Sequence, residues 1–449
     1  MIQLTPDTGV ALFGSHLERL EKRIAGTPQD WFLPTRRAAF AHLAELGFPT
    51  TRHEDWLYTS VAPIVETPFE YHATNGANIT RDQISPYLLG GSNGTLLVFI
   101  NGFYAAELSS PVSQSDGLRV RNLRAALDQG EPTLADHLSR YATHEHDAFT
   151  ALNTALMEDG AFIHVPKGLV VTDPLHLVFV SAPGGHPIAS HPRILIIADA
   201  GTQASIVETH VGINGGTYFT NPVTELIVGE DAVINHYKVD CGGSESFHVS
   251  NWNIHQGDNS TVNAYAAVLG GRLVRNCVNT VLGGAGCECT VNGLYIVADH
   301  QHVDNHLIVD HAEPRSRSRE AFKGVLNGHG RGVFTGRIIV REDAQQTDAK
   351  QTNMSLLLSE EAQVQSRPQL EILADDVKCT HGATVGQVDE EAVFYLCSRG
   401  LDEEAARSLL VYAFANDSIA SVRLEPLRQR LTSLLLSRLP QGGVLREAI

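Results

Sequence analysis

KCTHGATVGQVDEEAVFYLCSRG, residues Lys378 to Gly400, is the stretch where the chain changes from a strand pattern to a helix pattern. At its start, Cys379 and His381 alternate with polar or small residues, which is the two-residue period of a β-strand. Asp389 then has the character of a helix N-cap, and Gly400 has that of a helix stop. The stretch therefore predicts the last strand of a β-region followed by the first helix of an α-helical one.

The region before it, from Gly160 to His381, repeats one pattern. Runs of β-branched and aliphatic residues end at small acidic or glycine turns, which recur about every 25 residues. The turns are Asp199-Ala200, Asp231-Ala232, Asp258-Asn259, Ala285-Gly286, His311-Ala312, Asp343-Ala344, Glu361-Ala362 and Asp376-Val377. Periods of this length are typical of stacked supersecondary units, and no helical segment separates the strands. The pattern favours a mainly β fold with one continuous right-handed parallel β-helix, and a β-sandwich is the alternative.

Three parts are expected: a mixed, mainly helical N-terminal region (1–159), the β-helix core (160–388) and a C-terminal helical domain (389–449). In the first part, Pro34 and Gly47 bound a predicted helix, and Thr95 opens a predicted buried strand. Helix is also predicted from Phe149 to Gly160.

The C-terminal domain shows two amphipathic patterns, over 401–419 and 424–439. A solenoid end needs a cap, so we expect part of this helix pair to cover it. Asp402 is the expected N-cap of the first of these helices.

Composition excludes several classes of protein. A formal charge of −18 argues against nucleic-acid binding, which depends on Lys and Arg. No apolar run is long enough to span a membrane, and the first residues lack a secretory signal pattern. Six cysteines in 449 residues are too few for a disulfide scaffold, so reduced thiols and a cytoplasmic location are expected.

Two groups of residues could bind a metal. His300, His302, Asp304, His306 and His311 suit iron or zinc, and a metal-dependent enzyme on a β-solenoid is the alternative function. Positions 300 to 306 span about 20 Å of strand, however, too far for one ion to bind all of them. Polar packing within the solenoid is therefore the preferred interpretation.

Cys287 and Cys289 form the second group. A lone Cys-x-Cys pair is a weak metal signal, and buried small hydrophobes are the preferred interpretation. The sequence leaves open whether either group binds metal.

Missing motifs argue against an enzyme. The chain has no P-loop, no G-x-S-x-G and no dinucleotide-binding glycine motif, so no catalytic residue is assigned. A carbohydrate-active β-helix would need an aromatic-lined groove, and aromatic residues make up only 7% of the chain. A platform that binds other molecules is the simplest interpretation.

The stretch from Lys378 to Gly400, together with LLLSEEAQVQSRPQLEILADDV directly before it, resembles the C-terminal signature of the SufB/SufD family. These proteins are scaffold subunits of the SUF iron–sulfur cluster assembly machinery. PTTRHEDWLYTS, from Pro49 to Ser60, is similar to a string near the start of such proteins, although packing is the preferred role of Trp56 and Tyr58. The Cys-Thr-His-Gly-Ala-Thr-Val-Gly version resembles the SufD branch more than the SufB branch. The resemblance covers about Pro49 to Phe414.

The resemblance implies a non-catalytic subunit that works with a SufB-like paralogue and a SufC-like ABC-type ATPase. The solenoid edge would pair with the paralogue, and a homodimer of the isolated chain is left open. Cys379 and His381 would be half of a site, completed across the interface, for a transient iron–sulfur cluster, with no resident cofactor. The C-terminal helices would bind the ATPase, and deletion from Asp402 onward is expected to leave the solenoid folded. The expected contact residues are Tyr395, Arg399, Gly400, Leu409, Ala413 and Phe414.

Overall fold

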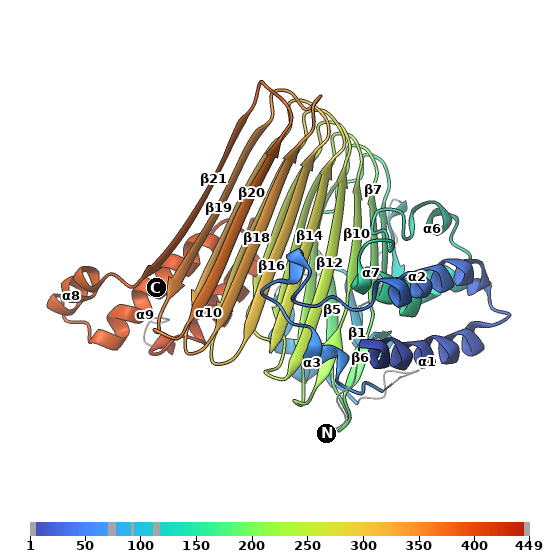
Figure 1. Cartoon of the computed structure of the whole chain (residues 1–449), viewed down its shortest axis with the longest axis horizontal. Helices are drawn as coiled ribbons and strands as arrows, with labels where there is room; N and C mark the ends of the chain where they lie inside the picture. The colour runs from blue at the N-terminus through green and yellow to red at the C-terminus, as the bar shows by residue number, and fades with distance from the viewer. Residues whose placement is uncertain (1–5, 71–77, 91–93, 111–116, 444–449) are drawn as a thin grey trace.

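The computed structural model describes residues 6–70, 78–90, 94–110 and 117–443, and a β-solenoid forms its centre (Figure 1). From Val233 onward, consecutive strands alternate between two facing sheets, so two strands and two turns make one coil. We name the sheets by their last strands, the β21 sheet and the β20 sheet. The predicted mainly β solenoid, with helices before and after it, is confirmed.

The described part of the β21 sheet has ten strands. In spatial order they are β2 (Phe103–Tyr104), β1 (Leu96–Ile100), β5 (Leu175–Ser181), β8 (Gln203–Gly212), β11 (Val233–Cys241), β13 (Thr261–Val268), β15 (Glu288–Val297), β17 (Arg317–Leu326), β19 (Asp348–Leu357) and β21 (Lys378–Gln387). Pairing along this sheet is parallel except between β1 and β2.

The β20 sheet faces it and is also parallel except between β3 and β4. Its strands are β20 (Gln363–Ile372), β18 (Arg331–Val340), β16 (His302–His311), β14 (Leu273–Leu282), β12 (Ser246–Gln256), β10 (Val223–Val228), β7 (Arg193–Ala198), β4 (Gly160–Val165) and β3 (Arg119–Asn122). Two short strands, β6 (Ile188–Ser190) and β9 (Tyr218–Thr220), pair beside this path.

At three levels of the solenoid the coils are between 26 and 31 residues long. Paired side chains that hydrogen-bond between neighbouring coils are 26 residues apart at Asn253 and Asn279, 29 at Asn276 and Asn305, and 31 at Glu320 and Gln351. Each coil bends at one corner through a residue with positive φ, where Gly, Asp and Asn are best tolerated. These corner residues are Gly201, Asp231, Asn259, Gly286, Arg315 and Gln346. The backbone N–H of each one donates to the corner of the next coil.

One predicted turn lies elsewhere. Seven of the eight predicted turns connect the β20 sheet to the β21 sheet and stack at this corner edge, whereas Glu361-Ala362 connects β19 to β20 at the opposite edge. The short spacing on either side of Glu361 therefore reflects a second kind of turn, and the coil period is longer than the predicted average.

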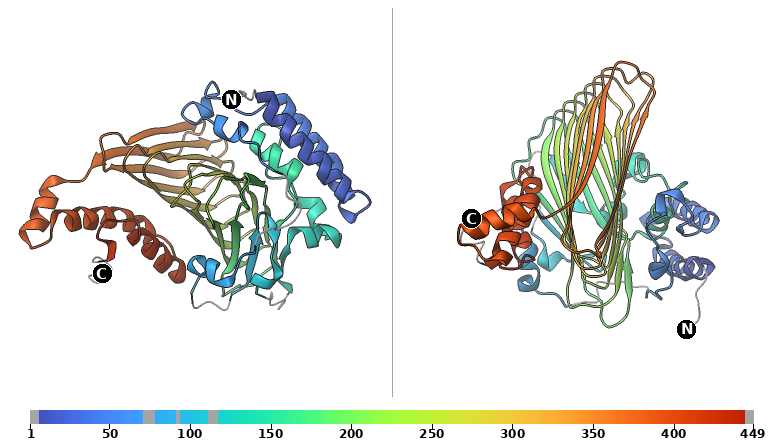
Figure 2. Two further views of the ribbon diagram at one scale, coloured as in Figure 1. Left: turned by 90° about the horizontal axis from the view of Figure 1, so that it is seen from below. Right: turned by 60° about the vertical axis from the view of Figure 1, so that its left-hand side comes forward.

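The α-helices of the N-terminal region are α1 (Pro6–Ile24), α2 (Leu33–Leu46), α3 (Ala62–Val65), α4 (Arg81–Ile84), α5 (Leu123–Asp128), α6 (Pro132–His137) and α7 (Ala148–Leu156). Helices α1, α2, α3 and α7 cover the outer face of the β20 sheet, whereas α4 packs against the β21 sheet (Figure 2). Phe13, Phe149 and Trp56 pack on the β20 sheet against Phe219 and Phe247 on the strands.

Helices and strands begin close to the predicted residues, but α7 ends at Leu156, and Gly160, the predicted helix end, is the first residue of β4. Gly47 ends α2 with φ 65° and a backbone N–H bonded to Leu43. The predicted strand from Thr95 is present as β1, and it extends the β21 sheet beyond the predicted core. The boundaries of the three predicted domains themselves stay a prediction.

The C-terminal helices are α8 (Glu390–Ser398), α9 (Glu403–Ile419) and α10 (Glu425–Leu436), with Asp389 and Asp402 as N-caps. The expectation that they cap the solenoid end is wrong. Val411 and Ile419 pack along the outer face of the β21 sheet, against residues such as Tyr265 and Val325. The helices lie along this flank because its strands carry outward apolar residues that the helical stripe covers.

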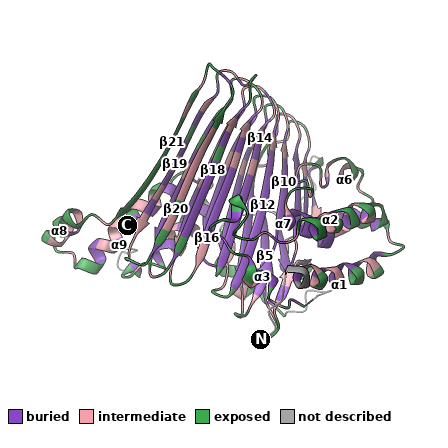
Figure 3. Cartoon of the chain, in the orientation of Figure 1, coloured by how far each residue is buried: buried purple, intermediate pink, exposed green. Residues whose placement is uncertain are grey.

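The C-terminal end of the solenoid is therefore open, with β20 and β21 as its last strands. Both are much more exposed than the strands before them (Figure 3). We call this surface the open end. None of the helices in the described part of the chain has the length and apolar character that crossing a lipid bilayer requires.

Candidate functional site at the open end

Strand β21 places Cys379 and His381 at the open end, on the face that points into the solenoid. Its register sets Cys379 beside Ala349 and His381 beside Gln351, and both partners are about 1% exposed. Alternate residues of a strand share a face, so the thiol and the imidazole lie in one inward row. Cys379 is half-buried and packs against the small apolar cluster around Ala349, whereas His381 is exposed. The predicted shared orientation follows from this strand.

Two inward rows continue from these residues into the solenoid. Beneath Cys379 lie Ala349, Ser318 and Cys289, one on each successive coil. Beneath His381 lie Gln351 and Glu320, and Gln351 Nε2 donates a hydrogen bond of 2.7 Å to Glu320 Oε2. The open end therefore has a polar floor on the histidine side.

Burial sets the protonation of the groups near this floor. It raises the pKa of Glu320 to about 7, because water is excluded from the carboxylate. It also raises the pKa of the Cys379 thiol. A metal binds the thiolate, so a metal that bound Cys379 would have to displace the thiol proton, and the raised pKa makes that step more costly.

Within the described ranges, no group of three or more His, Cys, Asp or Glu side chains has a geometry that could hold a metal ion. Cys379 and His381 therefore offer two donor atoms at an open surface, and further ligands would have to come from another molecule.

The predicted ATPase-contact residues divide into two sets. Tyr395, Arg399, Gly400 and Ala413 are exposed, but Leu409 and Phe414 are half-buried in the packing of α9 against the solenoid. Lys323 Nζ lies 4.6 Å from the centre of the Phe414 ring and donates to the Phe414 carbonyl oxygen. Leu409 and Phe414 thus contribute mainly to the packing of α9, because the outward strand face next to them is apolar.

Phe394 is the residue that sequence reasoning missed. It is 76% exposed, more than Tyr395 at 57%, and both project from α8, which stands away from the solenoid. Val393 is the buried residue of this helix. The signal was present in the sequence, since adjacent helix positions point in different directions and Val393 to Tyr395 cannot all face one core.

A groove separates α8 and α9 from the last coils. Its lining is partly apolar, with Leu358, Val388 and Val411, and it is crossed by the pair of Arg407 with Glu390. This groove runs from the base of α8 to the end of β21, so it joins the two surfaces described above.

The histidine cluster is dispersed by the fold. His302, Asp304 and His306 share the outer face of β16, where the N-terminal region occupies them. Thr59 Oγ1 donates to Asp304 Oδ2 at 2.6 Å and lies 2.9 Å from His302 Nε2, and His306 Nε2 lies 3.4 Å from Asp55 Oδ1. These residues anchor the segment that contains Trp56.

The other two histidines of the cluster lie elsewhere. His300 is in a turn and stacks on His329 with ring centres 5.0 Å apart. His311 points into the solenoid, bonds to the hydroxyls of Ser316 and Ser318, and has its pKa lowered to about 4 by burial. The five residues do not face one point. The alternative function, a metal-dependent enzyme, therefore has no metal site at this cluster.

The segment around Trp56 has the packing role expected of it. Trp56 is buried against Phe149, and the guanidinium of Arg275 lies 3.8 Å from the centre of its ring. Arg275 in turn pairs with Asp304. Tyr58 differs from the prediction, since it is 41% exposed, with the Arg367 guanidinium 5.9 Å from its ring centre.

The cysteines of the second group are buried, which agrees with their interpretation as small hydrophobic residues of the core. Cys287 and Cys289 lie within the main apolar cluster of the solenoid, and burial raises the pKa of both thiols. Cys397, in α8, is half-buried.

A second polar centre lies deep inside the first coils. The Glu208 carboxylate lies 2.8 Å from His236 Nε2 and 3.3 Å from Lys238 Nζ, and it accepts a bond of 3.0 Å from Thr224. All four residues are buried. The lysine supplies the positive charge that a metal would otherwise bring, so the cluster is internally compensated.

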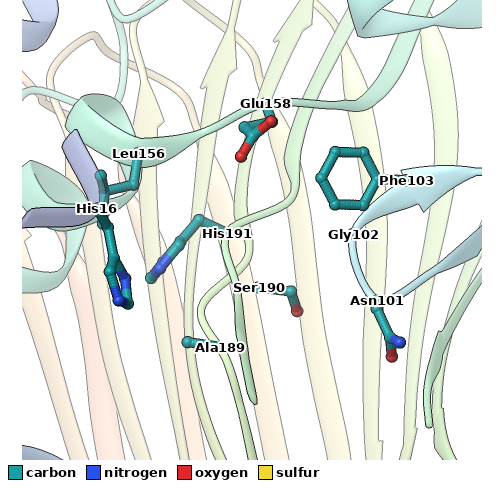
Figure 4. A pocket seen from close by; sticks show the side chains of 9 residues that line it. All are labelled: His16, Asn101, Gly102, Phe103, Leu156, Glu158, Ala189, Ser190 and His191. Carbon is teal, nitrogen blue, oxygen red and sulfur yellow. The ribbon is translucent and has the colours of Figure 1, made fainter. Parts of the chain in front are cut away.

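A small pocket lies where the N-terminal helices meet the first coils (Figure 4). His16 and His191 stand on one side of it and Asn101 and Phe103 on the other, with Glu158 between the two sides. The pocket has room for only a few water molecules. Burial lowers the pKa of His191 to about 3, so its ring stays neutral. These features fit a hydrated junction better than a ligand site.

Comparison with known proteins points in one direction. Residues 179–414 match the family model described as SUF system FeS cluster assembly, SufBD core domain, and residues 11–177 match the one described as SufBD protein N-terminal region. The chain is 29% identical over 412 residues to the iron–sulfur cluster assembly protein SufD of Escherichia coli, covering 91% of this chain and 94% of that protein.

Two further relatives show the same level of similarity. An iron–sulfur cluster assembly SufBD family protein of Synechocystis is 29% identical over 423 residues, which cover 92% of this chain and 93% of that protein. The chloroplastic protein ABCI7 of Arabidopsis thaliana is also 29% identical, over 90% of this chain and 85% of its own length.

Proposed function

Because the chain belongs to the SufBD family of iron–sulfur cluster assembly proteins, we propose that it is the SufD-like scaffold subunit of a SUF complex. In this role it contributes binding residues and no catalytic ones, and it holds no resident cofactor. The transient iron–sulfur cluster is the cargo of the complex. Because Cys379 would serve as a free thiol, we place the complex in the cytoplasm, where thiols stay reduced.

The observation that carries this proposal is an incomplete pair of donors on an unpaired edge. Cys379 and His381 face inward at the open end, and the outer edge of β21 has no partner in the described chain. An unpaired strand edge is a template for pairing with another chain. A SufB-like paralogue that adds its own strands there would bring the remaining ligands to the cluster. In isolation the same edges can pair between two copies.

The second surface is α8. Phe394 and Tyr395 are large, exposed and close to the charged side chain of Arg399, whose guanidinium lies 5.2 Å from the Tyr395 ring centre. Aromatic residues and arginine are the residues that most often dominate binding energy at interfaces. A SufC-like ABC-type ATPase bound here would supply the nucleotide hydrolysis for which this chain has no motif.

The test is to co-express the chain with the paralogue and the ATPase and to purify the complex. Iron and sulfide content per complex would be measured for the wild type, for His381→Ala and for His300→Ala. His300 is the matched control, since it is exposed and lies in a turn far from β21 in the sequence. We expect His381→Ala to assemble normally and to lose cluster content, while His300→Ala behaves as the wild type.

A complex that assembles normally and keeps full cluster content with His381→Ala would contradict the assignment of His381. Failure of the three chains to form any complex would contradict the scaffold role itself.

A further inference from the structure

We propose that Gln351, held in place by Glu320, is a positioning residue that fixes the orientation and tautomer of His381. The inference rests on the proposed function, because it concerns how the histidine of that site is prepared for its cargo. It assigns a role to two buried polar residues that the cluster itself does not contact.

The first step is the direction of the Gln351 amide. Gln351 Nε2 donates to Glu320 Oε2 at 2.7 Å, and both side chains are almost inaccessible to water, at 1% and 2% exposed. Above about pH 7, where Glu320 is ionised, its carboxylate only accepts hydrogen bonds, so it selects the NH₂ end of the amide. The carbonyl end is thereby directed to the other side.

The second step is that this carbonyl oxygen has no partner. Gln351 Oε1 is buried and makes no hydrogen bond to any residue that the structure describes. Buried acceptors are nearly always satisfied, and leaving one without a donor costs about 1–3 kcal/mol. The position therefore calls for a donor from a neighbouring group.

The third step is the space around the amide. Gly336 faces it from the β20 sheet, and a Cβ atom at that residue would overlap the Gln351 side chain. A glycine at this place leaves room for the amide between the two sheets. The arrangement is specific to this level of the solenoid, because the next inward residue, Asn353, bonds across to Ser366 instead.

The fourth step is the position of His381. The β19–β21 register places it directly beside Gln351, on the same inward face. Neighbouring strands are about 4.8 Å apart, so a ring N–H can reach the orphan oxygen by side-chain rotation alone. When one ring nitrogen donates to Gln351 Oε1, the other carries the lone pair and is the one left for iron. Outer partners of this kind fix the tautomer of metal-binding histidines.

A simpler arrangement is that Glu320 and Gln351 only close a polar gap in the interior. The two cases differ in one observable, the tautomer of His381 in the isolated, metal-free chain. This can be measured by ¹⁵N NMR of chain labelled at histidine, with the His381 signals identified by their loss in His381→Ala.

The variants are Gln351→Leu, which removes donor and acceptor at similar volume, and Gln351→Asn, which withdraws the amide by one methylene. Asn353→Leu is the matched control, since it loses a buried bond of 2.9 Å but lies beside Ala383. Glu320→Gln is the conservative variant, because it keeps an acceptor for Gln351 Nε2. Circular dichroism and melting temperature establish which variants fold.

We expect one dominant His381 tautomer in the wild type, Asn353→Leu and Glu320→Gln, and a mixture in the Gln351 variants. In the complex, loss of Gln351 should weaken iron binding by about 10-fold, the lower end for such outer partners. A folded Gln351 variant with the wild-type tautomer pattern would overturn the inference. If His381→Ala instead left cluster content unchanged while Gln351 still controlled the tautomer, the proposed function of His381 would fail and the positioning contact would stand.

Discussion

Glu320 and Thr59 are single polar residues whose hydrogen bonds join neighbouring coils and the N-terminal segment to the solenoid, respectively. Glu320 is inside, where burial raises its pKa to about 7 from an ordinary value of 4.5. Thr59 is outside the β20 sheet, where it is 1% exposed and bonds to Asp304 across 245 positions of sequence. Neither the bond of Glu320 to Gln351 nor that of Thr59 to Asp304 can be predicted from the residue pattern. In each bond the two residues are distant in sequence and of common types.

The Glu320 carboxyl should make stability depend on pH. Its pKa is higher in the folded than in the unfolded chain, so folding favours the protonated form. This stability is complete below about pH 4.5 and is lost as the pH rises to about 7, by roughly 3 kcal/mol. We expect Glu320→Gln to remove this dependence and to melt higher than the wild type at pH 8. Urea unfolding at pH 5 and pH 8 measures it.

Glu361→Gln, at an exposed turn, is the control for that experiment. Equal pH profiles for Glu320→Gln and the wild type would show that the buried carboxyl is not protonated on folding.

Thr59→Val should separate the N-terminal anchor from the solenoid. The change keeps the shape of the side chain but leaves Asp304 and His302 without the hydroxyl. We expect a loss of about 1–3 kcal/mol in the free energy of unfolding, the usual cost of an unsatisfied buried group. Thermal unfolding measures this, with Thr51→Val, at an exposed position, as the control. A change as small as that of the control would mean that the remaining contacts, those of Trp56 and Asp55, anchor this segment without Thr59.

At the scale of elements, β21 and α8 are two parts of the described chain that lack a full set of neighbours. The backbone N–H of Lys378 donates to β19, so along a parallel strand the even-numbered N–H groups face β19 and the odd-numbered ones face outward. Helix α8 contacts mainly α9 and leaves its aromatic residues exposed.

Val385→Pro uses this alternation to test the edge. The Val385 N–H faces outward, and proline is tolerated in an edge strand at such a position. We expect the isolated chain to keep its melting temperature within a few degrees while pairing with the paralogue is lost. Thr384→Pro, one residue earlier, removes an inward donor and should destabilise β21 itself. Size-exclusion chromatography of the mixed chains checks this, and normal pairing by Val385→Pro would place the interface elsewhere.

The α8 surface is tested by Phe394→Ala combined with Tyr395→Ala. Both side chains are exposed, so the melting temperature should stay unchanged, whereas affinity for the ATPase should fall by at least about 30-fold, as expected for two interface hot spots worth over 1 kcal/mol each. Trp31→Ala, an exposed aromatic in the N-terminal region, is the control. Isothermal titration of the purified chains gives the affinities, and unchanged binding would remove α8 from the interface.

At the scale of the whole molecule, the sequence predicted what depends on local pattern. The strands, the helix caps at Asp389 and Asp402, and the stop at Gly47 are confirmed, because each follows from nearby residues. The handedness of the solenoid and the roles of Cys379 and His381 stay predictions. The predicted position of the C-terminal helices, over the solenoid end, was wrong. An amphipathic stripe shows that one face of a helix is buried, but it does not show which surface covers that face.

The packing of α9 on the β21 sheet also changes the result expected when the chain is truncated at Asp402. The outer face of the β21 sheet carries Tyr265 and Val325 under α9, so a chain ending at Asp402 would expose a large apolar surface. We therefore expect this truncated chain to aggregate, rather than to keep a folded solenoid as the sequence alone suggested. Light scattering during expression and refolding checks this, and a soluble, cooperatively melting truncation would restore the original expectation.

The open end has a consequence for how a cell supplies this protein. If the proposed partner covers its last two strands, the chain is safest when that partner is present from the moment of synthesis, because free copies can join one another at the same edges. Production of the two subunits in matched amounts, from one transcript or under one signal, would keep the free pool small. Copies made in excess would be substrates for proteolysis, so the abundance of this chain should follow that of whatever covers its open end.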